Sequence, residues 1–406
     1  METRQRIDRR RFLKGSGGAI AGTALGGCLT GGDDSITIGW VHPLSGQNAG
    51  IGEQQRLGAK LFTEQVNDAG GLDGRDVDSV HEDTQSDPQT GKQKARKLID
   101  SEGVDLLAGG FSSSVVLSIM PYADEQNVPF ISSGAAGSIT REECRRTTFN
   151  VVKRTNQAAN TMVPWSVEEL GGDFWLHYQD YVWGQSGRDA VSSVAEDVDG
   201  ATLLDVTKTG SGTSDFGSYV SQIASSDAEW VYLQLLGSDA VNFVKQADNY
   251  GLTDDVDLVL AGANSTKLFR NGAGDAALGN YTLVKYDEAH DSEANRSFVS
   301  DFREKHKAAP SLLSWGTWVS GNMYREAVEA AGSTDTDDVV STLPEVEFDT
   351  GMGTGSFREC DNLLALPSFV GEYVPDDVEP YPGFDVRQKY EPEEVMLSCE
   401  EAGCSK

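Results

Sequence analysis

The segment ITIGWVHPLSG, residues 36–46, decides the fold, because a run of β-type apolar residues leads directly into a Gly-containing loop. A helical pattern follows, in which apolar side chains recur every three or four residues between Leu57 and Val66, and Gly70 ends it. A second β-type run begins at Val77. Strand, helix and strand in this order predict a βαβ unit with parallel strands.

The same alternation continues along the chain with a period of about 25–35 residues, which predicts an α/β fold with doubly wound parallel sheets. It restarts near residue 149, so two similar α/β halves around a cleft are expected. The Pro- and acid-rich segment 375–406 is expected to be irregular. Strands are predicted at 36–41, 77–81, 104–108, 128–132, 149–153, 174–178, 202–207, 230–236, 257–260 and 281–286. The clearest helices are predicted at 90–100, 115–125, 156–170, 293–307 and 315–331.

The composition excludes some partners. The 406 residues include 33 Lys and Arg against 64 Asp and Glu, a net charge of −31, while 38% hydrophobic residues are enough to form cores. A surface this acidic repels phosphate backbones and anionic membranes, so nucleic-acid binding is not expected. The acidity also predicts a halophilic protein, because salt would screen the mutual repulsion. The alternative is an ordinary acidic surface.

The first 28 residues indicate the compartment. Residues 8–14, DRRRFLK, resemble a twin-arginine export signal, and a short run of small and apolar residues ends at Cys28 in a sequence that resembles a lipobox. Residues 1–27 are therefore expected to be removed, which leaves 27 basic and 62 acidic residues and a charge of −35. We expect lipid attachment at Cys28, a flexible tether over 28–35 and a place on the extracytoplasmic face of the membrane. The alternative is a chance basic stretch before a chance Cys.

Four cysteines remain after Cys28, and an even number in an exported protein predicts two disulfides. Three connectivities are possible. The short spacing of Cys399 and Cys404 favours a pair between them, which leaves Cys144 with Cys360; free thiols are the alternative. No metal site is expected, because no Cys-x-x-Cys occurs and no His lies nearby.

Three groups of motifs carry a resemblance to a known family. The motifs are 38–46 with 58–62 and 67–75, then 109–114 with 127–136, and finally 180–186. Together they resemble the type I substrate-binding proteins of ABC importers, in particular the Leu/Ile/Val-binding and amide-binding family, over residues 36–374. With the acidic composition, the chain resembles a haloarchaeal-type lipoprotein of that family.

The resemblance implies two Rossmann-like lobes joined by hinge strands, with a small-molecule solute held between them. Lobe 1 would comprise 36–155 and 286–350, and lobe 2 would comprise 156–285 and 351–374. Closure of the lobes would be read by the permease and ATPase subunits of an importer. The family implies no cofactor, and a monomer is expected.

The site is expected at the carboxyl ends of the strands. Ser112, Ser113 and Ser114 follow a strand and open a helix, where unpaired N–H groups bind a carboxylate or amide oxygen; the alternative is that they only cap the helix. Tyr181 and Trp183 could wall the other side of the cleft, although core packing would also explain them. The candidate ligand contacts are Ser45, Ile51, Ser112, Ser113, Ser114, Ala135, Ala136, Tyr181, Trp183, Leu236, Gly237 and Asn264.

Two departures from the family pattern bear on the solute. Ala136 stands where amino-acid-binding members commonly hold a hydroxyl, and the positions that usually meet the ammonium group align with Leu236 or Gly237 and with Ala263 or Asn264. A buried ammonium without a counter-charge is costly. The predicted solute is a branched-chain amino acid, an amide or a urea-like compound, and a carboxylate remains open.

An enzyme is not expected. Residues 184–188, GQSGR, lack the final Gly of a nucleophile elbow. The five His residues form no recognisable triad or His-Glu-x-x-His motif. An exported hydrolase is therefore a remote alternative. A lipoprotein that presents solute to a signalling receptor is the nearer one.

Overall fold

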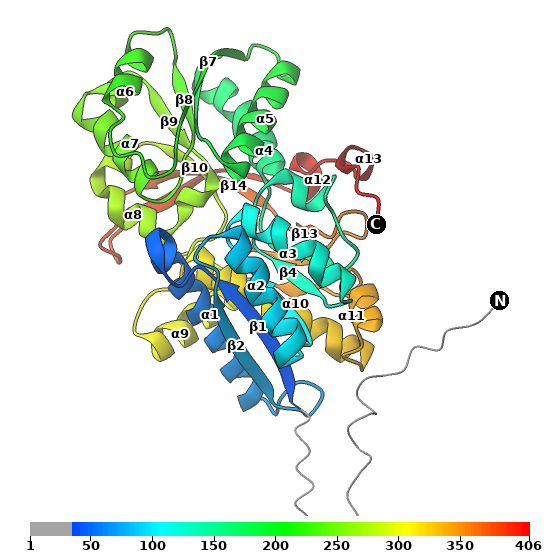
Figure 1. Ribbon diagram of the computed structural model, residues 1–406. Coiled ribbons are helices and arrows are strands. Elements are labelled where there is room, and N and C mark those ends of the chain that lie inside the picture. Colours follow the sequence, from blue (N-terminus) through cyan, green and yellow to red (C-terminus); the bar gives the residue numbers. More distant parts are fainter. Residues whose placement is uncertain (1–34) are drawn as a thin grey trace, which may run out of the picture. The chain divides into compact units, whose positions relative to one another are not determined.

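The computed structural model describes residues 35–406 (Figure 1). The predicted signal, the tether up to residue 34 and Cys28 lie outside the described residues. A first sheet has five parallel strands in the order β2-β1-β3-β4-β5. Its strands are β1 (Ile36–His42), β2 (Val77–Asp83), β3 (Leu106–Gly109), β4 (Phe130–Ser132) and β5 (Thr148–Asn150).

The second sheet has the order β15-β14-β10-β9-β8-β6-β7. Its first five strands in sequence are parallel and repeat the order of the first sheet, whereas β14 and β15 are antiparallel additions at one edge. Both sheets therefore have the doubly wound order 2-1-3-4-5, which confirms the predicted fold class. The strands are β6 (Asp173–Gln179), β7 (Thr202–Thr209), β8 (Trp230–Gln234), β9 (Asp257–Leu260), β10 (Tyr281–Val284), β14 (Ser368–Val374) and β15 (Gly383–Tyr390).

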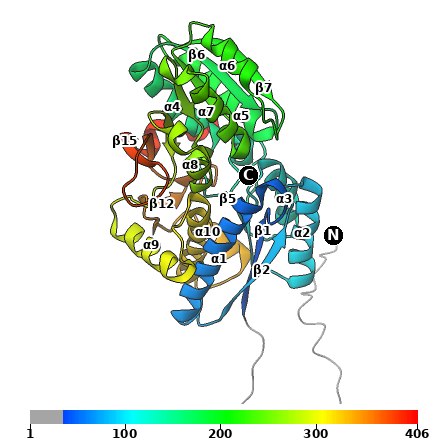
Figure 2. The same cartoon turned by 90° about the vertical axis from the view of Figure 1, so that its left-hand side faces the viewer.

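Helices cover both faces of the first sheet. Figure 2 shows α2 (Pro88–Lys97) and α3 (Ser113–Glu125) on one side of β1 and β2, and α9 (Glu293–His306) and α10 (Leu312–Ala331) on the other, where α1 (Ala49–Asp68) packs against α10. Successive side chains of a strand point to opposite faces. Accordingly, Ile38 and Trp40 pack in the core with α1 and α10, and Val41 packs in the core with α2 and α3.

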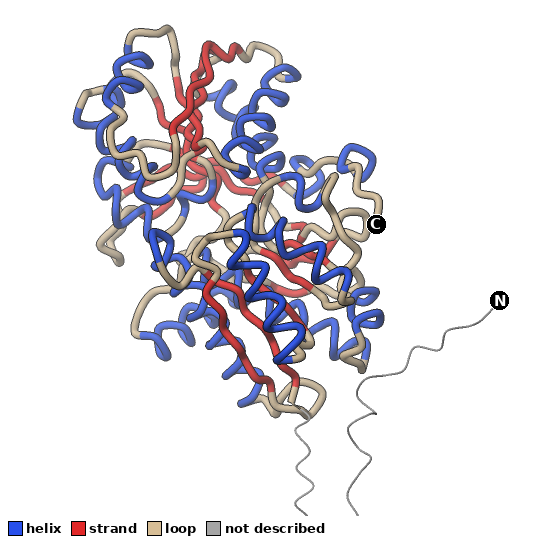
Figure 3. The backbone as a smooth tube through the Cα atoms, viewed as in Figure 1, coloured by secondary structure: helices blue, strands red, loops and turns tan. Residues whose placement is uncertain are grey.

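The second sheet is covered in the same way, as the tube in Figure 3 shows by its red strands between blue helices. The helices α4 (Thr155–Glu169) and α5 (Val182–Asp197) form one core with the sheet, and α6 (Gly217–Ala224), α7 (Gly237–Asn249) and α8 (Lys267–Ala273) form the other. The smaller helices are η2 (Gly46–Asn48), η3 (Leu98–Glu102), η4 (Gly137–Thr140), η5 (Leu252–Asp254), η6 (Gly262–Ser265), η7 (Gly274–Ala277), α11 (Thr336–Thr342), α12 (Pro392–Val395) and α13 (Cys399–Ala402).

The chain passes between the two sheets at three places, which we call the crossing segments: residues 151–154, 285–292 and 366–367. The last of these lies later than expected. A small sheet of β11 (Phe348–Asp349), β12 (Thr354–Phe357) and β13 (Leu364–Ala365) precedes it and packs with the core of the first sheet. Residues 351–366 therefore belong with the first sheet, because the Phe357 ring packs on Phe149 at 5.0 Å and Leu363 bridges to Asn150.

The segment 375–406, expected to be irregular, contains β15, α12 and α13. It is ordered because β15 pairs along the length of β14 and packs Phe384 on Tyr373. Two disulfides are present, but the predicted connectivity was wrong: Cys144 pairs with Cys404 and Cys360 with Cys399. The short helix α13 lies between Cys399 and Cys404, so each reaches a different part of the chain.

Candidate functional site

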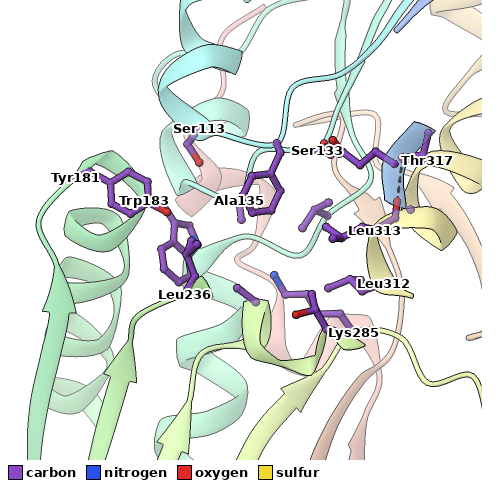
Figure 4. Close-up of a pocket in the computed structure, with 16 residues that line it drawn as sticks. Ser113, Ser133, Ala135, Tyr181, Trp183, Leu236, Lys285, Leu312, Leu313 and Thr317 are labelled. Carbon is purple, nitrogen blue, oxygen red and sulfur yellow. Dashed lines mark hydrogen bonds between the residues drawn. The ribbon is translucent and has the colours of Figure 1, made fainter. Parts of the chain in front are cut away.

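A cavity lies where loops at the carboxyl ends of both sheets meet (Figure 4). The space between its wall atoms amounts to about 640 Å³, a figure that includes space open to solvent. Its walls come from the loops after β3, β4, β6, β8, β9 and β10, together with α1 and α10. Ligands of doubly wound sheets bind at such carboxyl ends, near the point where the strand order reverses. The fold therefore places two such points at one cavity.

The turn after β3 brings α3 to the cavity. Gly109 has a φ of 104°, and a Cβ there would lie 2.4 Å from the carbonyl oxygen of Val41, so the backbone approach requires glycine. The turn places Phe111 and Ser113 on the cavity wall. The Ser113 Oγ accepts a hydrogen bond from the N–H of Ala136 at 3.1 Å, which ties the start of α3 to the loop after β4.

The loop after β4 supplies Ser133 and Ala135 to the wall. The Ser133 Oγ accepts a hydrogen bond at 3.1 Å from Nε2 of Gln55, which α1 brings to the same wall. A hydroxyl that accepts one bond keeps its own hydrogen for another partner. Ser133 can therefore donate to a ligand in the cavity.

The second sheet contributes the opposite wall. Tyr181 and Leu236 are the N-cap residues of α5 and α7, and Trp183 lies in the first turn of α5. The ring centroids of Tyr181 and Trp183 are 6.0 Å apart. Burial, followed by the charge of Asp239, raises the pKa of Tyr181, so its hydroxyl stays protonated. The helices α3, α5 and α7 all begin at the cavity, and the positive ends of their dipoles favour an anion there.

The third wall is apolar. The first turns of α10 supply it, along with Val152 from the first crossing segment. Ser311 caps α10 by accepting from the N–H of Ser314, which fixes the direction of the side chains that follow. The α10 residues at the cavity are Leu312, Leu313, Gly316 and Thr317.

Among the described residues, one charged side chain reaches the cavity wall, that of Lys285 on the second crossing segment. It is 6% exposed, and its Nζ donates a hydrogen bond at 3.1 Å to the carbonyl oxygen of Lys153, itself buried on the first crossing segment. Burial lowers the pKa of Lys285 to about 8. Burial, followed by the charge of Lys285, lowers the pKa of Lys153 to about 7.

Carboxylates are absent from this cavity as far as the described residues go. The nearest acid identified by its effect on the wall is Asp239, which acts on Tyr181. Its carboxylate already accepts bonds from the N–H groups of Gly212 and Thr213 and from Nε2 of Gln179. Because its hydrogen bonds are used within the protein, Asp239 is poorly placed to serve a ligand.

Two further cavities adjoin the first and share Phe111 and Leu236 with it, and we call the three together the cleft. Both adjoining cavities also lack Asp and Glu in the part of the chain that the structure describes. Behind the wall, burial and the neighbouring His81 lower the pKa of His42 to about 3, and burial lowers that of His81 to about 4. Both are therefore neutral near pH 7. Over residues 35–406, no group of His, Cys, Asp and Glu could hold a metal ion.

The structure brings most of the predicted contacts to the cleft. Ser113, Ala135, Tyr181, Trp183 and Leu236 line the main cavity. Ile51 and Gly237 line one adjoining cavity, and Ser112 and Ser114 line the other.

Three predicted contacts lie elsewhere. Ala136 and Asn264 are fully buried and line none of the three cavities, and the Asn264 amide donates to the carbonyl oxygen of Leu235. Ala263, the neighbour of Asn264, reaches the wall instead. Ser45 is exposed and lines none of the three cavities, because the wall from this part of the chain begins at Asn48.

Several wall residues escaped the sequence analysis. Lys285 had a signal, since it is the one charged residue in the strand predicted at 281–286. The contribution of α10 had none, because a helix late in the chain reaches the cleft only through the tertiary fold. Phe111 follows directly on the Gly109-Gly110 turn, and its place beside Ser112 could have drawn attention to it.

Comparisons with known proteins agree with this geometry. The family model described as "Periplasmic binding protein" matches residues 35–377, and a model of the twin-arginine translocation signal matches residues 6–26. A curated relative, Leu/Ile/Val-binding protein homolog 6 of Brucella melitensis, is 26% identical over 307 residues, which are 74% of this chain and 77% of the relative.

Two solved structures share the fold. A periplasmic binding protein from Burkholderia mallei is 26% identical, with a TM-score of 0.84, over 92% of this chain and 99% of that one. An amino acid ABC transporter substrate-binding protein from Pseudomonas fluorescens has the same TM-score at 19% identity, over the same shares of the two chains. None of the helices within residues 35–406 is long and apolar enough to cross a membrane.

Proposed function

The chain belongs to the periplasmic binding protein family, and from this premise we propose that it captures a small solute outside the cytoplasm and delivers it to an ABC permease. The cleft carries this proposal, because its walls come from the carboxyl ends of both sheets. A ligand there contacts both halves of the protein at once. Members of the family bind substrates rather than convert them, which agrees with the lack of a recognisable catalytic motif in the sequence.

Binding would be coupled to a change in the angle between the two sheets. The three crossing segments are short, and the first two contribute Val152 and Lys285 to the cavity wall. Domain closure around a ligand turns on a few such connecting residues. A solute that contacts both walls favours the closed arrangement by its extra contacts there. The permease would then recognise the closed form.

The class of solute is a finer proposal. The relatives reported above are named for Leu/Ile/Val and for amino acids, which supports a solute of amino-acid size. The prediction of a branched-chain amino acid, an amide or a urea-like compound stays a prediction.

The place of action follows from the signal at residues 6–26, which directs export. We further propose that Cys28 carries a lipid that tethers the mature chain to the membrane. Replacing it, Cys28→Ala, should move the protein from the membrane fraction to the medium, and retention in the membrane fraction would contradict the tether.

The charge of −31 supports adaptation to high salt, since salt screens the repulsion among surface carboxylates.

A thermal-shift screen of residues 35–406 tests the proposed function. The panel contains branched-chain amino acids, amides, urea and short carboxylates, and the screen is run at low and at molar KCl. We expect at least one compound to raise the melting temperature, because binding to the native state stabilises it by mass action. The melting temperature without solute should also be higher in molar KCl, and an unchanged value would count against salt adaptation.

A blocked cleft gives the matched control. Ala135 lies on the cavity wall, so Ala135→Phe fills part of the space that a solute would occupy. This variant should lose the shift while its melting temperature without solute changes little. A folded wild type that no compound stabilises would contradict the proposed function.

A further inference from the structure

Lys285 is a buried cation to which the proposed function assigns no role in binding. It follows directly on the last residue of β10, and the second crossing segment begins with it. A Cβ on Gly262 would lie 2.7 Å from its Cε, so the absence of a side chain at Gly262 leaves room for the lysine. Figure 4 shows the Lys285 nitrogen, in blue, directed into the group of labelled wall residues.

The ammonium group has unused hydrogens. Lys285 Nζ donates one hydrogen bond, to the carbonyl oxygen of Lys153, and a lysine ammonium carries three donors. None of the ion pairs found over residues 35–406 includes Lys285 or Lys153. Buried charges in proteins are normally paired. The structure therefore holds a cation at the cavity without its counter-charge.

The titratable groups around Lys285 do not supply that counter-charge. Lys153, on the neighbouring crossing segment, has the same sign. Tyr181 faces the cavity from α5 and stays protonated because its pKa is raised. Asp287, two residues along the chain, has its pKa raised to about 6 by burial and is ionised at pH 7, but its carboxylate accepts the N–H of Ala289 and forms no ion pair with Lys285 among the described residues. The lowered pKa values of Lys285 and Lys153 reflect the cost of charge at this place.

The walls of the cleft offer no carboxylate that could bind the ammonium group of a solute. The chain has 64 Asp and Glu, yet none lines the cleft in the region that the structure describes. An amino acid bound here would bury its ammonium near Lys285 without a carboxylate to offset the cost. The N-termini of α3, α5 and α7 add partial positive charge of the kind that favours an anion.

We propose that Lys285 binds the carboxylate of a solute that carries no ammonium group and whose apolar body packs between Leu236 and Leu312. This inference rests on the proposed function and names the class of its solute. The carboxylate would take the free donors of Lys285 and the hydroxyl hydrogen of Ser133 or Thr266, which line the same cavity.

Three matched compounds test the class. 4-Methylpentanoate, 4-methylpentanamide and leucine share one carbon skeleton and differ in the carboxylate and the ammonium, and benzoate with benzamide repeats the comparison on a flat body. Titration calorimetry on residues 35–406 should show binding of at least one carboxylate at least about tenfold tighter than binding of its amide or of leucine, the range of a charge-assisted hydrogen bond.

Two lysine variants localise the effect. Lys285→Met keeps the length of the side chain and should weaken carboxylate binding at least about tenfold. Lys389→Met removes a lysine from the exposed part of β15, where it pairs with Glu391, and should leave the affinity unchanged. A merely structural role for Lys285 would lower the melting temperature of Lys285→Met and leave its preference among the three compounds intact.

The pH dependence of the affinity for a carboxylate provides a further test, because a packing role of Lys285 alone would not produce it. Carboxylate binding needs protonated Lys285, so the affinity should be highest below about pH 7 and fall at least about tenfold as pH rises to about 9.5. In Lys285→Met this fall should be reduced or lost. Tighter binding of leucine or of an amide, or an unchanged affinity and profile in Lys285→Met, would overturn the inference alone. Binding of no compound would overturn both it and the proposed function.

Discussion

Single residues set the direction of the chain at the walls of the cleft, and Gly109 is the clearest case. Its φ of 104° and the close approach of the Val41 carbonyl turn the chain from β3 toward Phe111 and α3. Gly74 also has a positive φ, 71°, but a Cβ there would meet nothing within 4 Å. A comparison of the two glycines therefore separates the cost of backbone strain from the cost of a steric conflict.

Replacing each of these glycines by alanine should give different losses. Gly109→Ala adds a contact that the backbone must move to relieve, so we expect the free energy of unfolding to fall by about 3 kcal/mol or more. Gly74→Ala should cost about 1 kcal/mol, the strain of positive φ alone. Denaturant unfolding measures both, and equal losses would show that the approach to Val41 is not what requires Gly109.

At this scale the sequence predicts groups of residues better than it predicts single contacts. The three serines at the start of α3 follow from the rule that ligands bind beyond carboxyl strand ends, and all three line the cleft. Asn264 fails by one position, because η6 turns its amide inward to the Leu235 carbonyl. Local pattern does not fix which way such a short helix turns its side chains.

The C-terminal segment contains ordered elements that its sequence pattern did not predict. Its Pro and acidic residues predict irregular structure, yet β15 adds to the second sheet and Asn160 of α4 donates to the carbonyl oxygen of Val395 in α12. Beyond α12, Cys399 and Cys404 bind Cys360 and Cys144, beside the first sheet. The segment thus joins both halves of the protein outside the three crossing segments.

The two disulfides should contribute unequally to stability. The Cys144–Cys404 bridge spans 260 residues and the Cys360–Cys399 bridge spans 39, and loop entropy makes the longer closure worth about 1–2 kcal/mol more. The double variant Cys144→Ser with Cys404→Ser should therefore lose more free energy of unfolding than Cys360→Ser with Cys399→Ser. Denaturant unfolding under oxidising conditions measures this, and a larger loss from the shorter loop would contradict it.

For the molecule as a whole, the alternation of strands and helices in the sequence predicts nearly all of the fold. It predicts the two sheets because each βαβ unit is local in sequence and right-handed by general rule. The membership of residues 351–366 could not be predicted, since it depends on the packing of Phe357 against Phe149 across about two hundred residues. The α10 wall of the cleft was missed for the same reason.

The charge is also a property of the whole molecule, and the cleft departs from it. A chain of net −31 builds a cavity whose described walls hold Lys285 and no carboxylate. The acidity therefore describes the outer surface, and the chemistry of the cleft has to be read from its own walls.

Small-angle X-ray scattering of residues 35–406, with and without the tightest-binding solute of the screen, tests the central claim most directly. If the solute is held between the two sheets and closes them, the radius of gyration should fall on addition of solute. The fall should be absent in Ala135→Phe, whose cleft is blocked. A bound solute, shown by calorimetry on the same sample, with no change in the radius of gyration would contradict closure on the solute.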